Sequence, residues 1–142
     1  HKQEPGGGTT DFAVDIFCKG LTEGNYKSFV RRDTVLPMMY MEDAIRAAIQ
    51  IMDAPAHKIT VHTSYNLAAV SFSAGELEDE LRRHLPLLKV TYEPDKRQAI
   101  ADSWPKKIDD SQARKDWGWR HEYDLPKMTA DMVVNLKKKF GL

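Results

Sequence analysis

Thr34-Val35-Leu36-Pro37-Met38-Met39-Tyr40 is an extended, apolar stretch that runs directly into a helix predicted over residues 42–53. The first part is rich in residues that favour strands. The second part has apolar residues at helical spacing, and the helix is expected to end before Pro55. It is expected to bury Ala44, Ile45, Ala48, Ile49 and Met52. This junction is one step in a loose alternation of strands and helices along the chain, and that alternation predicts a mixed α/β fold.

Strands and helices alternate loosely on both sides of this stretch. A first helix, with Thr9 or Thr10 as its N-cap, is expected to end at Gly24. Further strands are predicted over 26–30, 59–63 and 87–92, and residues 65–72 are predicted to form a strand or an extended crossing. Further helices are expected after the capping box Ser73-Ala74-Gly75-Glu76, after Asp109 or Asp110, and after Asp124. The whole chain therefore fits one α/β unit of short strands and helices.

Length and composition exclude several classes of protein. The 142 residues fit one ordinary domain, and 21 basic residues balance 21 acidic ones, so the net charge is zero. Such a chain has no excess positive field that would recruit nucleic acid or an anionic membrane. No apolar stretch approaches the ~18 residues that a membrane span needs. We therefore expect neither nucleic acid nor a membrane as a partner.

Cysteine and histidine usage gives no indication of a metal or redox site. Cys18 is the single cysteine, cannot form an internal disulfide, and is expected to behave as a small buried hydrophobic residue. The histidines show neither i, i+4 pairing nor clustering with Cys18, and no metal site is predicted. They are His1, His57, His62, His84 and His121.

Two matches to the pattern Tyr-x-x-x-Lys are interpreted as chance. In short-chain dehydrogenases one helical turn places the Lys ammonium beside the Tyr hydroxyl and lowers its pKa. The matches here are Tyr92/Lys96 and Tyr123/Lys127, and each contains a proline that opposes a helical turn. A G-x-G-x-x-G loop between a strand and a helix is also absent. No catalytic residue is therefore assigned in this sequence.

The loop Gly6-Gly7-Gly8-Thr9-Thr10 is a candidate binding site. Glycines allow backbone amides to approach a ligand, two hydroxyl groups follow, and a helix begins at this point. Together these features predict a site for a carboxylate or a phosphate group. The alternative is a solvent-exposed loop with an ordinary threonine cap.

Trp104 and Arg97 form a second candidate. Trp104 precedes Pro105 in a polar stretch and could form a rigid pocket wall, while Arg97 could pair with an anionic ligand. The alternative is a structural Trp and a solvated Arg. Trp117 and Trp119, which flank Gly118, are expected to pack at a helix end.

Several long blocks, taken in order, carry a resemblance to a known family. They are Pro5-Gly6-Gly7-Gly8-Thr9-Thr10-Asp11-Phe12-Ala13-Val14, Leu36-Pro37-Met38-Met39-Tyr40-Met41-Glu42-Asp43-Ala44, Tyr65-Asn66-Leu67-Ala68-Ala69-Val70-Ser71-Phe72, Arg97-Gln98-Ala99-Ile100-Ala101-Asp102-Ser103-Trp104-Pro105, Asp109-Asp110-Ser111 and Asp116-Trp117-Gly118-Trp119. They resemble the C-terminal part of the NAD-dependent L-threonine 3-dehydrogenases, which are extended short-chain dehydrogenases of the epimerase/dehydratase superfamily. The resemblance spans about residues 5–132.

This resemblance implies roles for particular residues. Gly8, Thr9 and Thr10 would bind the amino-acid substrate, through its carboxylate, and Trp104 would close over it. Arg97 matches a superfamily position that binds nucleotide-sugar phosphate, and with threonine as substrate it could be structural. The reaction would oxidise L-threonine to 2-amino-3-oxobutyrate with NAD as cofactor.

The resemblance also implies that residues 1–142 are the C-terminal, substrate-binding portion of a Rossmann-type protomer. The N-terminal NAD-binding Rossmann portion, with its catalytic Tyr, would lie outside this chain, and the chain begins at His1 without an initiator Met. The isolated segment is therefore expected to be inactive. The intact enzyme would be a homodimer, mitochondrial in a eukaryote and otherwise cytoplasmic.

Two other functions remain open at this point. The chain could be a portion of a nucleotide-sugar epimerase or dehydratase. It could also be a non-catalytic module that uses the glycine loop to bind a small carboxylate.

Overall fold

Helix α1 (Phe12–Glu23) packs its apolar stripe into the larger of two cores in the computed structural model, which describes residues 7–142. Phe12, Ile16 and Phe17 are buried on this stripe. The helix ends at Gly24, whose φ of 70° places it in the left-handed region that favours glycine. Its N-cap is Asp11, so the expectation of a Thr9 or Thr10 cap is wrong.

Two pairs of short strands lie beside this helix. Strand β1 (Asn25–Ser28) pairs in parallel with β4 (Lys89–Tyr92), with Asn25 opposite Lys89. Strand β2 (Val35–Met38) pairs antiparallel with β3 (Val70–Ser73), with Leu36 opposite Phe72. The strands predicted over 26–30, 34–40 and 87–92 are confirmed in shorter form, and the one predicted over 65–72 is limited to its last residues.

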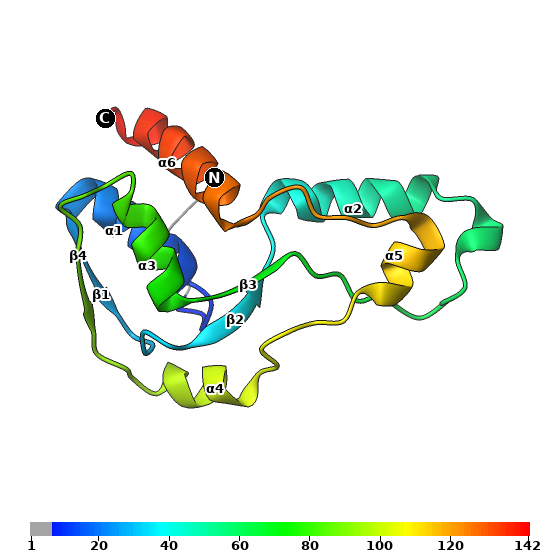
Figure 1. Cartoon of the computed structure of the whole chain (residues 1–142), viewed down its shortest axis with the longest axis horizontal. Coiled ribbons are helices and arrows are strands. Elements are labelled where there is room, and N and C mark those ends of the chain that lie inside the picture. Colours follow the sequence, from blue (N-terminus) through cyan, green and yellow to red (C-terminus); the bar gives the residue numbers. More distant parts are fainter. Residues whose placement is uncertain (1–6) are drawn as a thin grey trace.

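Helices α3 and α6 complete the lobe that holds the larger core. The capping box predicted before α3 (Ala74–Arg82) is confirmed, because the Ser73 hydroxyl accepts from the Glu76 amide and the Glu76 carboxylate accepts from the Ser73 amide. Helix α6 (Leu125–Phe140) begins at Asp124, whose carboxylate accepts from the Lys127 amide at 2.9 Å. Figure 1 shows α1, α3 and α6 gathered at one end of the molecule.

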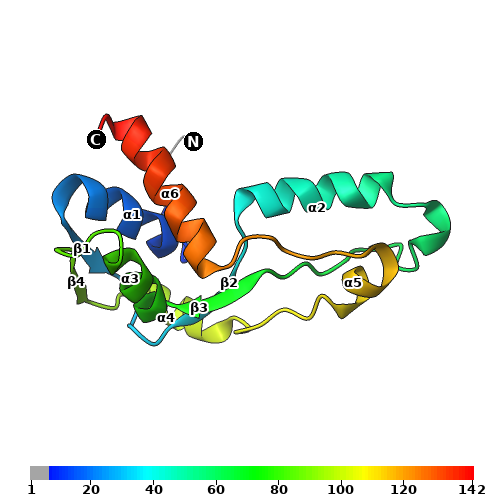
Figure 2. The same cartoon turned by 45° about the horizontal axis from the view of Figure 1, so that its top comes forward.

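The rest of the chain forms an arm that extends from this lobe. It consists of α2 (Met41–Asp53), the 3-10 turn η1 (Ala56–Lys58) and α5 (Ser111–Trp117), while α4 (Arg97–Ser103) lies on the lobe side. The turned view in Figure 2 also separates α2 and α5 from the lobe. The arm has its own small core of Ala47, Ala113 and Trp119, each fully buried. The mixed α/β architecture expected from the sequence is confirmed.

Asp43 joins the start of α2 to the segment that leads into α6. Its carboxylate is fully buried and accepts hydrogen bonds from the Arg46 guanidinium and from the backbone amides of Glu122 and Tyr123. Burial acts to raise the pKa of this carboxyl, but the bonds from Arg46 and the two amides outweigh it, and the pKa lies below its usual value. Arg46 in turn covers the ring of Trp119.

The strand predicted over residues 59–63 is wrong. The amides of Thr60 and Val61 donate to the Tyr65 hydroxyl instead of to a neighbouring strand. That hydroxyl donates to Asp116 at 2.6 Å, and Asp116 also accepts from Thr60. These bonds hold the pKa of Asp116 well below its usual range and fasten this loop to α5.

The face of α2 predicted to be buried is largely exposed. The residues that turn inward are Asp43 and Ala47, whereas Ile45 is 54% exposed, Ile49 49% and Met52 75%. Met41, at 58%, begins the same face one turn earlier. These four residues, the outer face of α2, form an apolar stripe in which each side chain is about half exposed or more.

Candidate functional site

A cavity of about 240 Å³ opens where the glycine loop, β2 and α6 meet. Most of its lining is apolar and rich in methionine: Ala13, Val14, Phe17, Met38, Met39, Met41, Phe72, Met128 and Met132. Thr10, Asp11 and Tyr40 add the polar groups. A small ligand with an alkyl part and one or two polar groups matches such a lining.

The glycine loop folds back on itself before α1 begins. The Gly8 amide donates to the Asp11 carboxylate at 2.8 Å, and the Asp11 amide donates to the Gly8 carbonyl at 3.2 Å. A Cβ at Gly8 would approach the Asp11 carboxylate at 3.2 Å, which explains a glycine here. Gly6, the first glycine of the predicted loop, lies outside the described residues. The amide of Gly8 is therefore occupied by an internal carboxylate.

Thr9 and Thr10 differ in position within this loop. Thr9 is 8% exposed and packs inward, whereas Thr10 lines the cavity. Among residues 7–142, no hydrogen bond engages either threonine side chain. The Thr10 hydroxyl is therefore available to a ligand that enters beside α1.

Tyr40 closes the other side of the cavity at the point where β2 passes into α2. Its hydroxyl donates to the Asp131 carboxylate of α6 at 2.5 Å, and its ring packs at 4.7 Å from that of Tyr123. Burial and this bond to Asp131 raise the pKa of the Tyr40 hydroxyl. Tyr40 therefore remains protonated and acts as a fixed wall.

Arg97 lies in a different, polar hollow. Its guanidinium stacks 3.3 Å from the centre of the Phe29 ring and donates to the Asp95 carboxylate at 2.6 Å. Asp15, whose carboxyl pKa is raised by burial, lines the same hollow. Arg97 does not line the cavity that holds Thr10, so the structure does not bring these two predicted residues together.

Trp104 lies just beyond α4 and is 42% exposed. Its backbone amide donates to the Ala101 carbonyl at 3.2 Å, and the residue does not line the cavity beside Thr10. Trp119, in contrast, is fully buried and donates from its ring nitrogen to the Ala68 carbonyl. The prediction that Trp117 and Trp119 pack together is confirmed by their ring separation of 6.0 Å.

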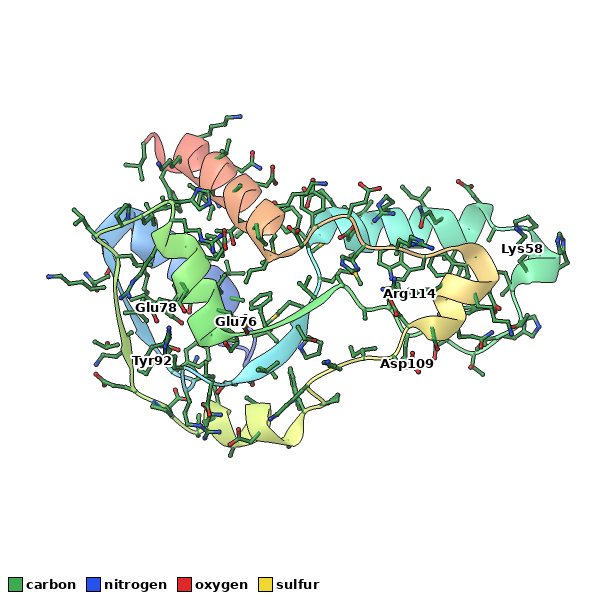
Figure 3. All side chains as sticks on the ribbon, in the orientation of Figure 1. Lys58, Glu76, Glu78, Tyr92, Asp109 and Arg114 are labelled. Atoms are coloured by element: carbon green, nitrogen blue, oxygen red, sulfur yellow. The ribbon has the colours of Figure 1, made fainter. Side chains whose placement is uncertain are left out.

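The two Tyr-x-x-x-Lys matches lack the arrangement of a catalytic pair. Figure 3 shows Tyr92 near Glu78, to which its hydroxyl donates at 2.5 Å. Burial and the Glu78 carboxylate raise the pKa of Tyr92, whereas a base would need a lowered one. Lys127 lies over the ring of Tyr123, at 4.2 Å from its centre, and donates to the Glu122 carbonyl.

The described residues contain neither a cluster of metal-ligating side chains nor a helix that could span a membrane. Over residues 7–142, no group of three or more His, Cys, Asp or Glu could hold a metal ion. No helix in that same range is long and apolar enough to cross a membrane. Cys18 is half-buried, and burial raises the pKa of its thiol.

The chain is similar to known L-threonine dehydrogenases in sequence and in structure. It is 50% identical over 131 residues to a bovine protein named L-threonine 3-dehydrogenase, mitochondrial. The aligned residues cover 92% of this chain and 35% of the bovine protein. It is 46% identical over 140 residues to an epimerase/dehydratase of Staphylococcus haemolyticus, and the aligned residues cover 98% of this chain and 44% of that protein. The crystal structure of L-threonine dehydrogenase from Phytophthora infestans superposes with a TM-score of 0.93 at 46% identity. The superposition covers 97% of this chain and 45% of the Phytophthora chain.

The chain matches a portion of the L-threonine 3-dehydrogenase and epimerase/dehydratase family. It spans roughly a third to a half of the length of these relatives. No family model matches the chain. The resemblance to L-threonine 3-dehydrogenases that the sequence blocks predict is confirmed.

Sequence reasoning missed Asp11 and Tyr40 as residues of the cavity. Asp11 could have been found from its position three residues after Gly8, since an Asp side chain at that spacing often bonds to a preceding loop amide. Tyr40 carried no comparable signal, because only the tertiary fold brings it opposite Thr10.

Proposed function

We propose that this chain is the C-terminal, substrate-binding portion of an NAD-dependent L-threonine 3-dehydrogenase, which oxidises L-threonine to 2-amino-3-oxobutyrate. The observation that carries the proposal is the 50% identity to the bovine protein of that name over 92% of this chain. The small, apolar cavity beside Thr10 supports it, because threonine has a methyl group and few polar atoms.

In this proposal the substrate carboxylate lies at the start of α1. The Thr9 and Thr10 hydroxyl groups and the positive end of the helix would hold it, while Gly8 shapes the loop through its bond to Asp11. Trp104 would close over the substrate from the end of α4. Arg97 would support the fold through Phe29 and Asp95 and would not contact threonine.

The residues of this chain do not fit NAD. The Gly8 amide, which would face a pyrophosphate in a nucleotide-binding loop, already bonds to the Asp11 carboxylate, and that charge would repel phosphate. The pKa values of the Tyr40 and Tyr92 hydroxyl groups are raised, which is the opposite of what a general base needs. We therefore assign the cofactor and the base to an N-terminal NAD-binding portion.

The outer face of α2 supports the existence of such a portion. Met41, Ile45, Ile49 and Met52 expose a continuous apolar stripe, which is typical of a surface that packs against another body. The relatives extend well beyond the matched segment, which is 35% of the bovine protein. We expect the NAD-binding portion to pack against this stripe. Separately, we expect the intact enzyme to form a homodimer.

The isolated 142-residue chain is expected to bind L-threonine weakly and to produce no NADH. Incubation with NAD and L-threonine, followed by absorbance of NADH, tests the second statement, and NMR titration with L-threonine tests the first. NADH formation by the isolated chain would contradict the assignment of the cofactor and the base to an N-terminal portion. Binding of a nucleotide sugar in calorimetry, with none of threonine, would favour an epimerase or dehydratase.

Replacement of Trp104 by Ala in the intact enzyme is expected to raise the KM for threonine about tenfold, because an indole wall contributes about 1–2 kcal/mol to a small ligand. The KM for NAD should stay the same. Trp117→Ala, which alters an indole in the arm, serves as the control for general damage. An unchanged KM for threonine would remove Trp104 from the site.

The location of the intact enzyme follows from the same proposal. The bovine relative is named as mitochondrial. If this chain comes from a eukaryote, we expect the intact enzyme in the mitochondrion, and otherwise in the cytoplasm.

A further inference from the structure

The cavity beside Thr10 contains a single charged group among its lining residues, the carboxylate of Asp11. Its other lining residues are neutral, and no Lys, Arg or His borders it. Asp11 also forms no ion pair with the basic residues of the described range 7–142. A half-buried carboxylate that faces an apolar cavity without a cation favours a positively charged ligand group.

The geometry of the loop fixes this carboxylate in place. One oxygen of Asp11 accepts the Gly8 amide at 2.8 Å, and the Asp11 backbone amide bonds back to the Gly8 carbonyl. The second oxygen accepts no hydrogen bond from the described residues. Because the side chain is already oriented, binding a cation to this oxygen would cost little conformational entropy.

We propose that Asp11 binds the ammonium group of the substrate and makes this site selective for α-amino acids over plain carboxylic acids. The inference rests on the proposed function and deepens it. Thr9 and Thr10 hold the substrate carboxylate, Asp11 holds the adjacent ammonium, and the methionine-rich wall contacts the alkyl part. A zwitterion has its two charges only a few bonds apart. Neighbouring residues of one loop, Thr10 and Asp11, can therefore contact both charges.

The same charge disfavours the ligands of the sugar-nucleotide relatives. A diphosphate next to Asp11 would meet a carboxylate with no Lys or Arg in the cavity lining to offset the repulsion. An acid in which hydroxyl replaces the amino group of threonine would satisfy Thr9 and Thr10 but would leave Asp11 without its cation.

The test compares two ligands on the 142-residue chain by NMR titration: L-threonine, and its analogue with a hydroxyl in place of the amino group. The wild-type chain should prefer threonine. Asp11→Asn keeps an acceptor for the Gly8 amide but removes the charge, and it should weaken threonine binding about tenfold while the analogue binds as well or better. Asp11→Ser, a second neutral acceptor, should give the same reversal.

The control is Asp15→Asn, which removes an acid one turn further along α1 that does not line this cavity. It should leave the preference unchanged. If Asp11→Asn binds both ligands with an unchanged ratio, the selectivity role of Asp11 is overturned while the threonine site stands. Absence of threonine binding by the wild-type chain would overturn the proposed site and this inference together.

Discussion

Asp43→Ala is expected to destabilise the chain by about 3 kcal/mol, because it removes the acceptor of three hydrogen-bond donors at a fully buried position. The Arg46 guanidinium and the amides of Glu122 and Tyr123 would lose their partner. Thermal unfolding followed by circular dichroism should show a midpoint about 10 °C lower. On heating, the fluorescence of Trp119 should change at a lower temperature than the circular dichroism signal, because Arg46 covers the Trp119 ring.

Asp43→Asn is the matched control, because it keeps one acceptor oxygen and should cost about half as much. The pKa of Asp43 in the folded chain is lowered from its usual 3.8, so its contribution is complete above pH 3.8 and is lost as the pH falls through the lowered value. The acid limb of the stability curve should therefore be flatter in Asp43→Asn. Equal stability of Asp43→Ala and wild type would show that the α2 junction is held elsewhere.

The double variant Ile45→Glu/Ile49→Glu is expected to weaken the association of this chain with a separately produced NAD-binding portion by about 100-fold or more. Two carboxylates placed in an apolar contact must be desolvated without partners, and each costs about 2 kcal/mol or more. Calorimetric titration of the two polypeptides, or their co-purification, measures the effect. The isolated chain should keep its stability, because Ile45 and Ile49 are 54% and 49% exposed.

A double variant elsewhere adds the same charge without touching the outer face of α2. Leu87→Glu/Val134→Glu changes two apolar residues that are 89% and 51% exposed and lie on the lobe. This control should associate like the wild type. If both double variants associate equally well, the outer face of α2 is not the contact. Self-association of the wild-type chain that Ile45→Glu/Ile49→Glu abolishes would instead identify a second copy as the occupant.

Local signals in the sequence predict most of the fold correctly. The capping box at Ser73 and Glu76, the Asp124 cap and the glycine at position 24 depend only on residues a few positions apart. The parallel pairing of β1 with β4 could not be derived, since it joins Asn25 to Lys89 across more than sixty residues. The short helix α4 was also missed.

Two of the wrong predictions, the buried face of α2 and the strand over residues 59–63, have one physical reason in common. The apolar spacing in α2 identifies its apolar face but not the body that covers it, and the alternation over residues 59–63 identifies a strand-like segment but not a neighbouring strand. In this chain Ile45 remains exposed and Thr60 bonds to Tyr65 and Asp116. A periodic pattern indicates that a segment has an apolar or strand-like face. It does not show whether this chain contains the element that would pack against that face or pair with it.

Prediction of the candidate site was similarly uneven. The glycine loop before α1 is a local feature that the sequence identifies, and Thr10 of this loop lines a cavity, while its binding role stays a prediction. Trp104 and Arg97 were grouped with it by resemblance, whereas the structure holds Arg97 on Phe29 in a separate hollow. The bond between the Asp11 carboxylate and the Gly8 amide was not predicted.

The small core of the arm has a consequence for cooperativity. Three fully buried residues, Ala47, Ala113 and Trp119, hold the arm, while the lobe has a much larger cluster. A segment with so few buried contacts opens at a lower free energy than the lobe, so its amides exchange with solvent earlier. If an NAD-binding portion packs on α2 as we propose, part of the energy of association would be used to order the arm, and the two portions would bind less tightly than their contact area implies.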